Sequence, residues 1–142
     1  MPEPNHFLLG AAACSGIAAL LHLGCIVFGA PWYRFFGAGE RMAQLAEAGN
    51  RYPAYVSLFI AAVLAAWALY ALSGAGMLPR LPFVRAVLCA ITAIYLMRGL
   101  AVLPLLLFTR GRSTAFWWWS SAICLAIGAL HLLGLRQAWT LL

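Results

Sequence analysis

The sequence predicts an all-α integral membrane protein, a four-transmembrane-helix bundle with a short interfacial amphipathic helix between helices 1 and 2. The 142-residue chain is 65% hydrophobic and only 8% charged, so one soluble core could not bury its apolar surface. Apolar runs also reach the roughly 20 residues that a membrane-spanning helix needs. The expected spans are about 7–30, 55–72, 82–108 and 115–138. They use most of the chain, which predicts a single membrane domain over residues 1–142.

The connection between the first two spans, residues 31–53, contains the predicted amphipathic helix. Between residues 38 and 49, Ala38, Met42 and Leu45 share one helical face, and charged side chains occupy the other. A helix with these two faces is typical of a segment that lies on the membrane surface. The later connections, 73–81 and 109–114, are short, and the first of them is rich in glycine and proline breakers.

The nine Lys and Arg residues are all arginines. Their distribution between the two faces predicts the orientation of the chain in the membrane. With four spans, both termini share one face, and segment 31–53 lies on the other with the 109–114 turn. The terminal face holds Arg80, Arg85 and Arg136, whereas the other face holds Arg34, Arg41, Arg51, Arg110 and Arg112. The positive-inside rule therefore predicts a cytoplasmic 31–53 loop and external termini, in a bacterial inner membrane. The net charge of +6 reflects these flanking arginines, so we expect a lipid bilayer as partner and no nucleic acid.

Each expected span carries one stripe of small and polar residues at helical spacing, which indicates the face turned toward the other helices. The stripes are Ser15, Ala18, His22 and Cys25; Ser57, Ala61, Ala65 and Ala68; Arg85, Cys89, Thr92, Tyr95, Arg98 and Gly99; and Trp117, Ser121, Cys124, Gly128 and His131.

Arg98, near the middle of the third span, is the strongest functional signal, because a guanidinium at that depth is costly without a partner or water. At about 1.5 Å per residue, His22, Tyr95 and Ser121 fall at a similar depth. Glu40 lies on the same side of the membrane. We therefore predict a ligand-binding set of Arg98, His22, Tyr95, Ser121 and Glu40, in which Arg98 anchors an anionic amphiphile or lipid-like ligand.

Two alternatives stay open at the level of the sequence. In the first, Arg98 is a structural residue that snorkels, or that is satisfied by carbonyls freed at Pro104 or by a neighbouring subunit. The chain would then be a non-catalytic structural or assembly subunit, in a homo-oligomer or a larger membrane complex. In the second, the chain is a membrane enzyme that acts on a lipid-like substrate with His22 or Tyr95 as the acid–base group.

Several chemistries are disfavoured by the residues themselves. The chain has no Asp, so a Ser-His-Asp triad is impossible, and no catalytic residue can be assigned. His22 and His131 differ in depth by roughly 8–10 Å, which disfavours a haem held between them. The four cysteines form no CxxC pair, and Arg98 would repel a cation. We therefore predict no cofactor and no metal.

Overall fold

Three long apolar helices dominate the structure, a computed structural model that describes residues 3–102, 104 and 114–142. The residues in this part of the chain form helices and turns, with no strand among them. The helices α1 (His6–Phe28), α4 (Tyr52–Gly74) and α7 (Thr114–Ala138) are each long and apolar enough to cross a membrane. Large apolar side chains are exposed along all three, for example Leu20, Phe59 and Ile123. An outward apolar face is stable in lipid and costly in water.

A fourth membrane span is not established. The helix α5 (Val84–Leu100) has 17 residues and ends at Leu100, whereas the predicted third span continues to residue 108. The end of that predicted span, at 103 and 105–108, lies outside the described residues. Residues 109–113 of the predicted 109–114 connection, with Arg110 and Arg112, also lie outside the described residues. The described part of the chain therefore contains three candidate spans together with the shorter α5.

The connection after α1 forms two short helices, α2 (Ala30–Phe35) and α3 (Glu40–Glu47). The first span was expected to continue to residue 30, but Gly29 adopts φ 70° and ψ −143°, which ends α1 at Phe28. Pro31 falls in the first turn of α2, where its missing N–H costs no hydrogen bond. The chain therefore turns at Gly29 before it reaches the proline. The location of α3 at a membrane surface stays a prediction.

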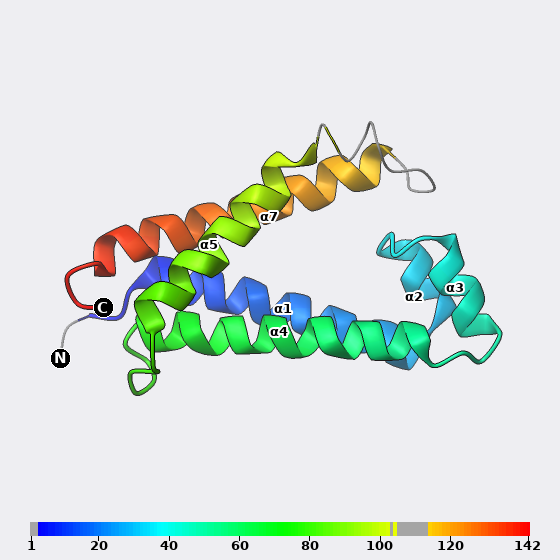
Figure 1. The fold of residues 1–142 in the computed structure, drawn as a ribbon, viewed down its shortest axis with the longest axis horizontal. Helices are drawn as coiled ribbons and strands as arrows, with labels where there is room; N and C mark the ends of the chain where they lie inside the picture. Colours follow the sequence, from blue (N-terminus) through cyan, green and yellow to red (C-terminus); the bar gives the residue numbers. More distant parts are fainter. Residues whose placement is uncertain (1–2, 103, 105–113) are drawn as a thin grey trace.

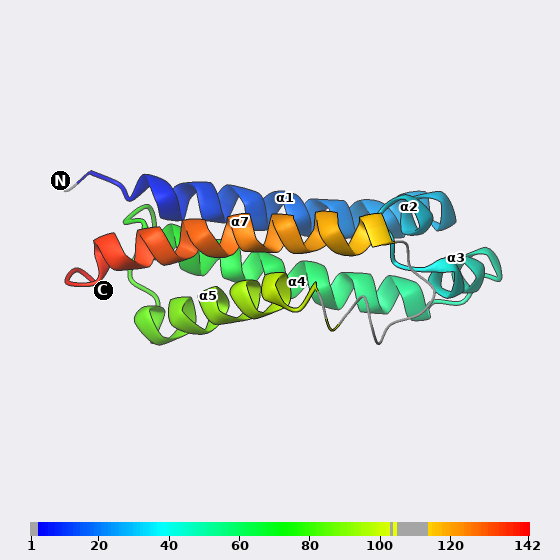
Figure 2. The same ribbon diagram turned by 90° about the horizontal axis from the view of Figure 1, so that it is seen from above.

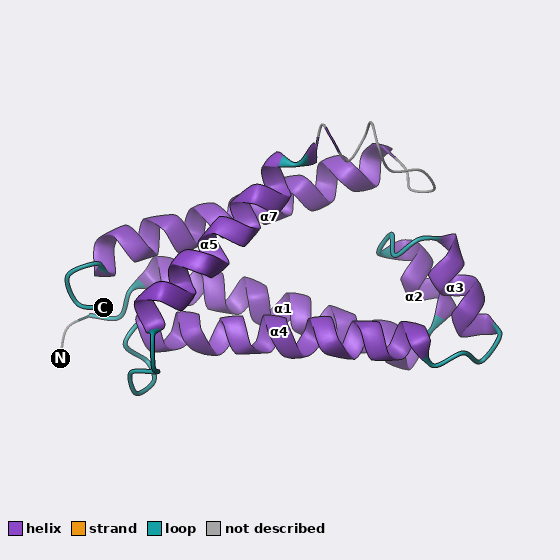
Figure 3. Cartoon of the chain, in the orientation of Figure 1, coloured by secondary structure: helices purple, strands orange, loops and turns teal. Residues whose placement is uncertain are grey.

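The long helices are arranged as two antiparallel pairs. In Figures 1 and 2, α1 runs beside α4, and α5 runs beside α7. The start of α1 and the end of α7 lie at one end of the molecule, and α2 and α3 lie at the other. Figure 3 shows that the two pairs come close at the terminal end and diverge toward α2 and α3. At the terminal end Leu8, Leu88 and Ile91 are almost completely buried.

Glycine allows α5 and α7 to approach closely. A Cβ added at Gly99 would lie 2.5 Å from Cγ of Leu125 and 3.0 Å from its backbone nitrogen. A Cβ at Gly128 would lie 2.8 Å from Cδ2 of Leu96. Small residues at a contact between helices bring the two backbones together and make dense packing possible without a large apolar core. This contact places the side of α5 that carries Arg98 against α7.

Candidate functional site

The guanidinium of Arg98 is held by three residues of α7. Its Nη1 donates to Oγ of Ser121 at 3.1 Å, and its Nη2 donates to Oγ of Ser120 at 2.9 Å. Its central carbon lies 5.2 Å from the ring centroid of Trp117, a cation–π distance. These residues are spaced i, i+3 and i+4, so one face of α7 presents all three. The side chain of Arg98 is half-buried in this arrangement.

The Arg98 side chain extends toward the start of α7. The neighbouring Gly99 packs against Leu125, whereas the guanidinium contacts Ser120 and Ser121, which are about one turn closer to Thr114. At a rise of about 1.5 Å per residue, Ser120 lies about 9 Å from the first residue of α7. The charge is therefore nearer the end of this candidate span than the backbone of Arg98 is. This is the direction in which a snorkelling arginine extends.

Among the residues that the structure describes, no carboxylate pairs with Arg98. The chain contains three acidic residues. Glu40 and Glu47 both bind Arg34, each with a shortest N–O distance of 2.7 Å. Glu3 precedes α1 at the opposite end of the molecule, where it lines a cavity with His6. The positive charge of Arg98 is therefore met by two neutral hydroxyls and an indole face, and it keeps its affinity for an anion.

Glu40 was expected near Arg98, and the structure instead places it in a cluster with Arg34 and Glu47. The guanidinium of Arg34, in α2, donates to both carboxylates, which lie at the two ends of α3. These hydrogen bonds lower the pKa of Glu40 and of Glu47 and raise the pKa of Arg34. The cluster is solvent-exposed, so its main effect is to join α2 to α3.

Tyr95 makes its contacts away from Arg98, in a buried cluster to which four helices contribute. Its hydroxyl lies 2.9 Å from Oγ of Ser15 in α1. Its ring packs edge-on against Trp67 of α4, with centroids 5.1 Å apart, and stacks on His131 of α7 at 5.4 Å. Nδ1 of His131 lies 3.0 Å from the carbonyl oxygen of Ile127, while its Nε2 finds no hydrogen-bond partner among the described residues. Tyr95 is therefore a core residue that connects the two helix pairs.

His22 was also predicted beside Arg98, but its hydrogen bond stays within α1. Its Nδ1 lies 2.8 Å from the carbonyl oxygen of Ala18. Within the described part of the chain, no hydrogen bond joins it to Arg98. Of the five predicted residues, the structure thus brings Arg98 and Ser121 into direct contact. Ser120 and Trp117 were not in the predicted ligand-binding set, although Trp117 shares the predicted inward stripe with Ser121 and the helical spacing of Ser120 could have identified it.

The described residues show no metal-binding cluster: no three His, Cys, Asp or Glu side chains gather within residues 3–102, 104 and 114–142. Comparison with known proteins found no matching protein family, no matching curated protein and no matching solved structure. What the site can bind is therefore argued from the side chains of Arg98, Ser120 and Ser121 themselves. A charged, forked donor flanked by two hydroxyls is suited to binding the oxygens of a phosphate or carboxylate.

Proposed function

We propose that this chain is a small integral membrane protein that binds an anionic amphiphile, such as an anionic phospholipid, at Arg98. One observation carries the proposal: the guanidinium lies against an apolar helix, held by Ser120, Ser121 and Trp117, and has no carboxylate to balance its charge. A cation in such a place attracts a lipid-soluble anion more strongly than a cation already paired with a carboxylate would.

The depth of the guanidinium supports a head group as the bound anion. A charge about 9 Å inside the start of α7 lies near the boundary between acyl chains and head groups, if α7 spans the bilayer. The run Phe116–Trp119 at the start of α7 fits an interfacial aromatic belt. The fork of Arg98 can contact two phosphate oxygens, and the hydroxyl of Ser121 can donate to a third, whereas that of Ser120 donates to the carbonyl of Trp117.

We place this end of the molecule on the cytoplasmic face of a bacterial inner membrane, because the sequence predicts five flanking arginines on this side and three on the other. In this orientation α3 lies along the membrane surface, and the termini face outward. The cytoplasmic leaflet is rich in anionic lipids, so the same face supplies the ligand that Arg98 requires.

A second candidate is a non-catalytic structural or assembly subunit. The observation that favours it is that the two serine hydrogen bonds also join α5 to α7. Replacement of Arg98 would then loosen the helix pair without affecting any ligand. We do not propose catalysis, since Tyr95 and His22 make their hydrogen bonds away from Arg98.

The test compares Arg98→Gln with Arg85→Gln. Arg85 is a matched control on the same helix, and its guanidinium donates to the carbonyl of Trp139 at the other end of α5. Phosphatidylglycerol and phosphatidylcholine binding to the purified proteins is measured by native mass spectrometry. We expect Arg98→Gln to weaken phosphatidylglycerol binding about 10- to 100-fold, because a hydrogen bond to a charged group contributes about 1.5–3 kcal/mol.

Arg85→Gln should retain the wild-type affinity, and neither variant should change the weak binding of phosphatidylcholine. Equal phosphatidylglycerol affinity in wild type and Arg98→Gln would refute the proposal. If Arg98→Gln leaves lipid binding intact but lowers the stability of the fold, the structural-subunit candidate is favoured instead.

A further inference from the structure

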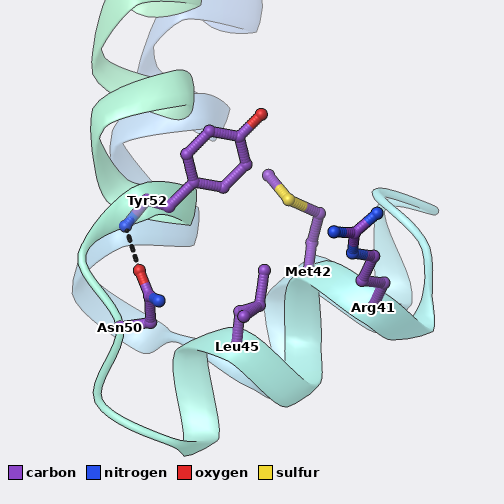
Figure 4. Close-up of a pocket in the computed structure, with 5 residues that line it drawn as sticks. All are labelled: Arg41, Met42, Leu45, Asn50 and Tyr52. Carbon is purple, nitrogen blue, oxygen red and sulfur yellow. Dashed lines mark hydrogen bonds between the residues drawn. The ribbon is translucent and has the colours of Figure 1, made fainter.

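A separate cavity of about 460 Å³ lies between α3 and the start of α4. Its lining residues are Arg41, Met42, Leu45, Asn50 and Tyr52. Figure 4 shows the first three projecting from one side of α3, with the side chain of Met42 directed toward the ring of Tyr52. The cavity thus combines one cation with an apolar floor and two neutral polar side chains.

Arg41, the cation of this cavity, forms no ion pair within the described part of the chain. Glu40 and Glu47, the acidic residues of α3, are both bound by Arg34. Among the described residues no carboxylate therefore pairs with Arg41. Oδ1 of Asn50 accepts a hydrogen bond from the backbone N–H of Tyr52 at 2.8 Å, which leaves the amide NH2 of Asn50 as a donor. The polar groups of the cavity are mainly donors, so they complement an anion.

An apolar track leads away from the cavity along α4. Tyr52 is the first residue of this candidate span, so the cavity lies at the level where α4 would enter the membrane. Tyr55 and Phe59 follow at i+3 and i+7 on the same face and are 62% and 71% exposed. Phe59 lies about 10 Å along the helix from Tyr52. An acyl chain that leaves the cavity could run over these two rings.

We propose that this cavity binds the head group of an anionic phospholipid, with the phosphate on Arg41 and an acyl chain along Tyr55 and Phe59. Charge complementarity identifies the head group as anionic, and the exposed aromatic track identifies the ligand as a lipid instead of free phosphate. The site shares the membrane placement of the proposed function, but it is separate from Arg98, which lies between α5 and α7.

The test measures phosphatidylglycerol binding to the full chain by native mass spectrometry, in Arg41→Gln and in Arg51→Gln. Arg51 is an exposed arginine of the same connection that does not line the cavity, so it controls for diffuse surface attraction. We expect Arg41→Gln to weaken binding at this site about fivefold or more, and Arg51→Gln to leave it unchanged. Equal losses in the two variants would overturn the proposal.

A second arm distinguishes a lipid from free phosphate. The double variant Tyr55→Ser with Phe59→Ser should weaken phosphatidylglycerol binding, and millimolar inorganic phosphate should not displace the lipid. If phosphate displaces it, and the double variant binds phosphatidylglycerol as wild type does, the site binds phosphate and the lipid proposal is wrong.

The Arg98→Gln background separates this proposal from the proposed function. Arg98→Gln should retain phosphatidylglycerol at the α3–α4 cavity, and addition of Arg41→Gln should weaken this remaining binding about fivefold or more. If Arg98→Gln alone removes all bound phosphatidylglycerol, the cavity proposal fails while the proposed function stands. If Arg41→Gln alone removes all of it, the proposed function fails and the cavity proposal stands.

Discussion

The hydrogen bond between Tyr95 and Ser15 connects the two helix pairs, and its contribution to stability can be measured. The two hydroxyl oxygens are 2.9 Å apart. Ser15 is fully buried, and Tyr95 is 6% exposed. Tyr95→Phe removes only the hydroxyl, because the ring can keep its packing between Trp67 and His131. The substitution therefore isolates the hydrogen bond from the aromatic contacts.

The expected magnitude is modest. A buried hydroxyl that loses its partner costs about 1–3 kcal/mol, and the low end applies because a helical serine can turn to a carbonyl of its own helix. We therefore expect Tyr95→Phe and Ser15→Ala each to lower the free energy of unfolding by about 1 kcal/mol. Hydrogen bonds between membrane helices average about 0.6 kcal/mol in double-mutant cycles and reach about 1.7 kcal/mol. The double variant should therefore lose less free energy of unfolding than the two single variants lose together, and the difference should be about 0.6–1.7 kcal/mol.

The assay is unfolding in mixed micelles with increasing sodium dodecyl sulfate, followed by circular dichroism, on wild type, both single variants and the double variant. Tyr70→Phe is the control, since the hydroxyl of Tyr70 makes no hydrogen bond within the described part of the chain. Additive effects of Tyr95→Phe and Ser15→Ala would show that the two hydroxyls do not interact, and would refute this description of the contact between the pairs.

Two further predictions concern helix packing and pH. Gly99→Ala should destabilise the α5–α7 pair by about 1–3 kcal/mol, because the added methyl group would overlap Leu125. Gly16→Ala, where nothing lies within 4 Å, should be neutral or stabilising in the same unfolding assay, and equal effects would contradict the packing model. Hydrogen bonds from Arg34 lower the folded-state pKa of Glu40 and of Glu47. The ionised carboxylates therefore stabilise the α2–α3 contact at any pH above their unfolded-state pKa. This stabilisation is lost as the pH falls below the ordinary glutamate pKa of 4.5 and through the lower folded-state pKa values. Hydrogen exchange of residues 40–48, corrected for intrinsic rates, should then accelerate at acidic pH, and Glu40→Gln with Glu47→Gln should remove the pH dependence. A wild-type rate that does not change with pH would exclude this role of Arg34.

The long helices could be predicted because length and hydropathy are properties of a continuous stretch of chain. The expected spans 7–30, 55–72 and 115–138 correspond to α1, α4 and α7, with ends that differ by up to three residues. The end of α1 was placed too late because Gly29 lies inside an apolar run and resembles any other small residue there. Its positive φ becomes visible only in the folded backbone.

The contact of Arg98 with Ser121 could also be predicted, because helical periodicity and depth depend only on residue spacing. The partners of Tyr95 and Glu40 could not. Tyr95 and Arg98 are less than one turn apart, yet Tyr95 contacts Ser15 and His131 while Arg98 contacts Ser121. Which neighbouring helix each of these side chains contacts depends on how the α1–α4 pair packs against the α5–α7 pair.

By itself, the sequence determined that the chain forms long apolar helices, and that it has too few acidic residues to neutralise its arginines. Both conclusions follow from composition and from spacing along one helix, and neither requires knowledge of helix packing. Only the tertiary structure decided which arginine forms ion pairs with the acidic residues of α3. The turn at residues 36–39, with positive φ at Gly37 and Gly39, folds α3 back on α2, so that Arg34 binds both Glu40 and Glu47. Among the described residues this leaves Arg41 and Arg98 without a carboxylate partner. The physical reason is that a hydrogen bond needs contact within about 3 Å, which only the packing of separate elements can provide.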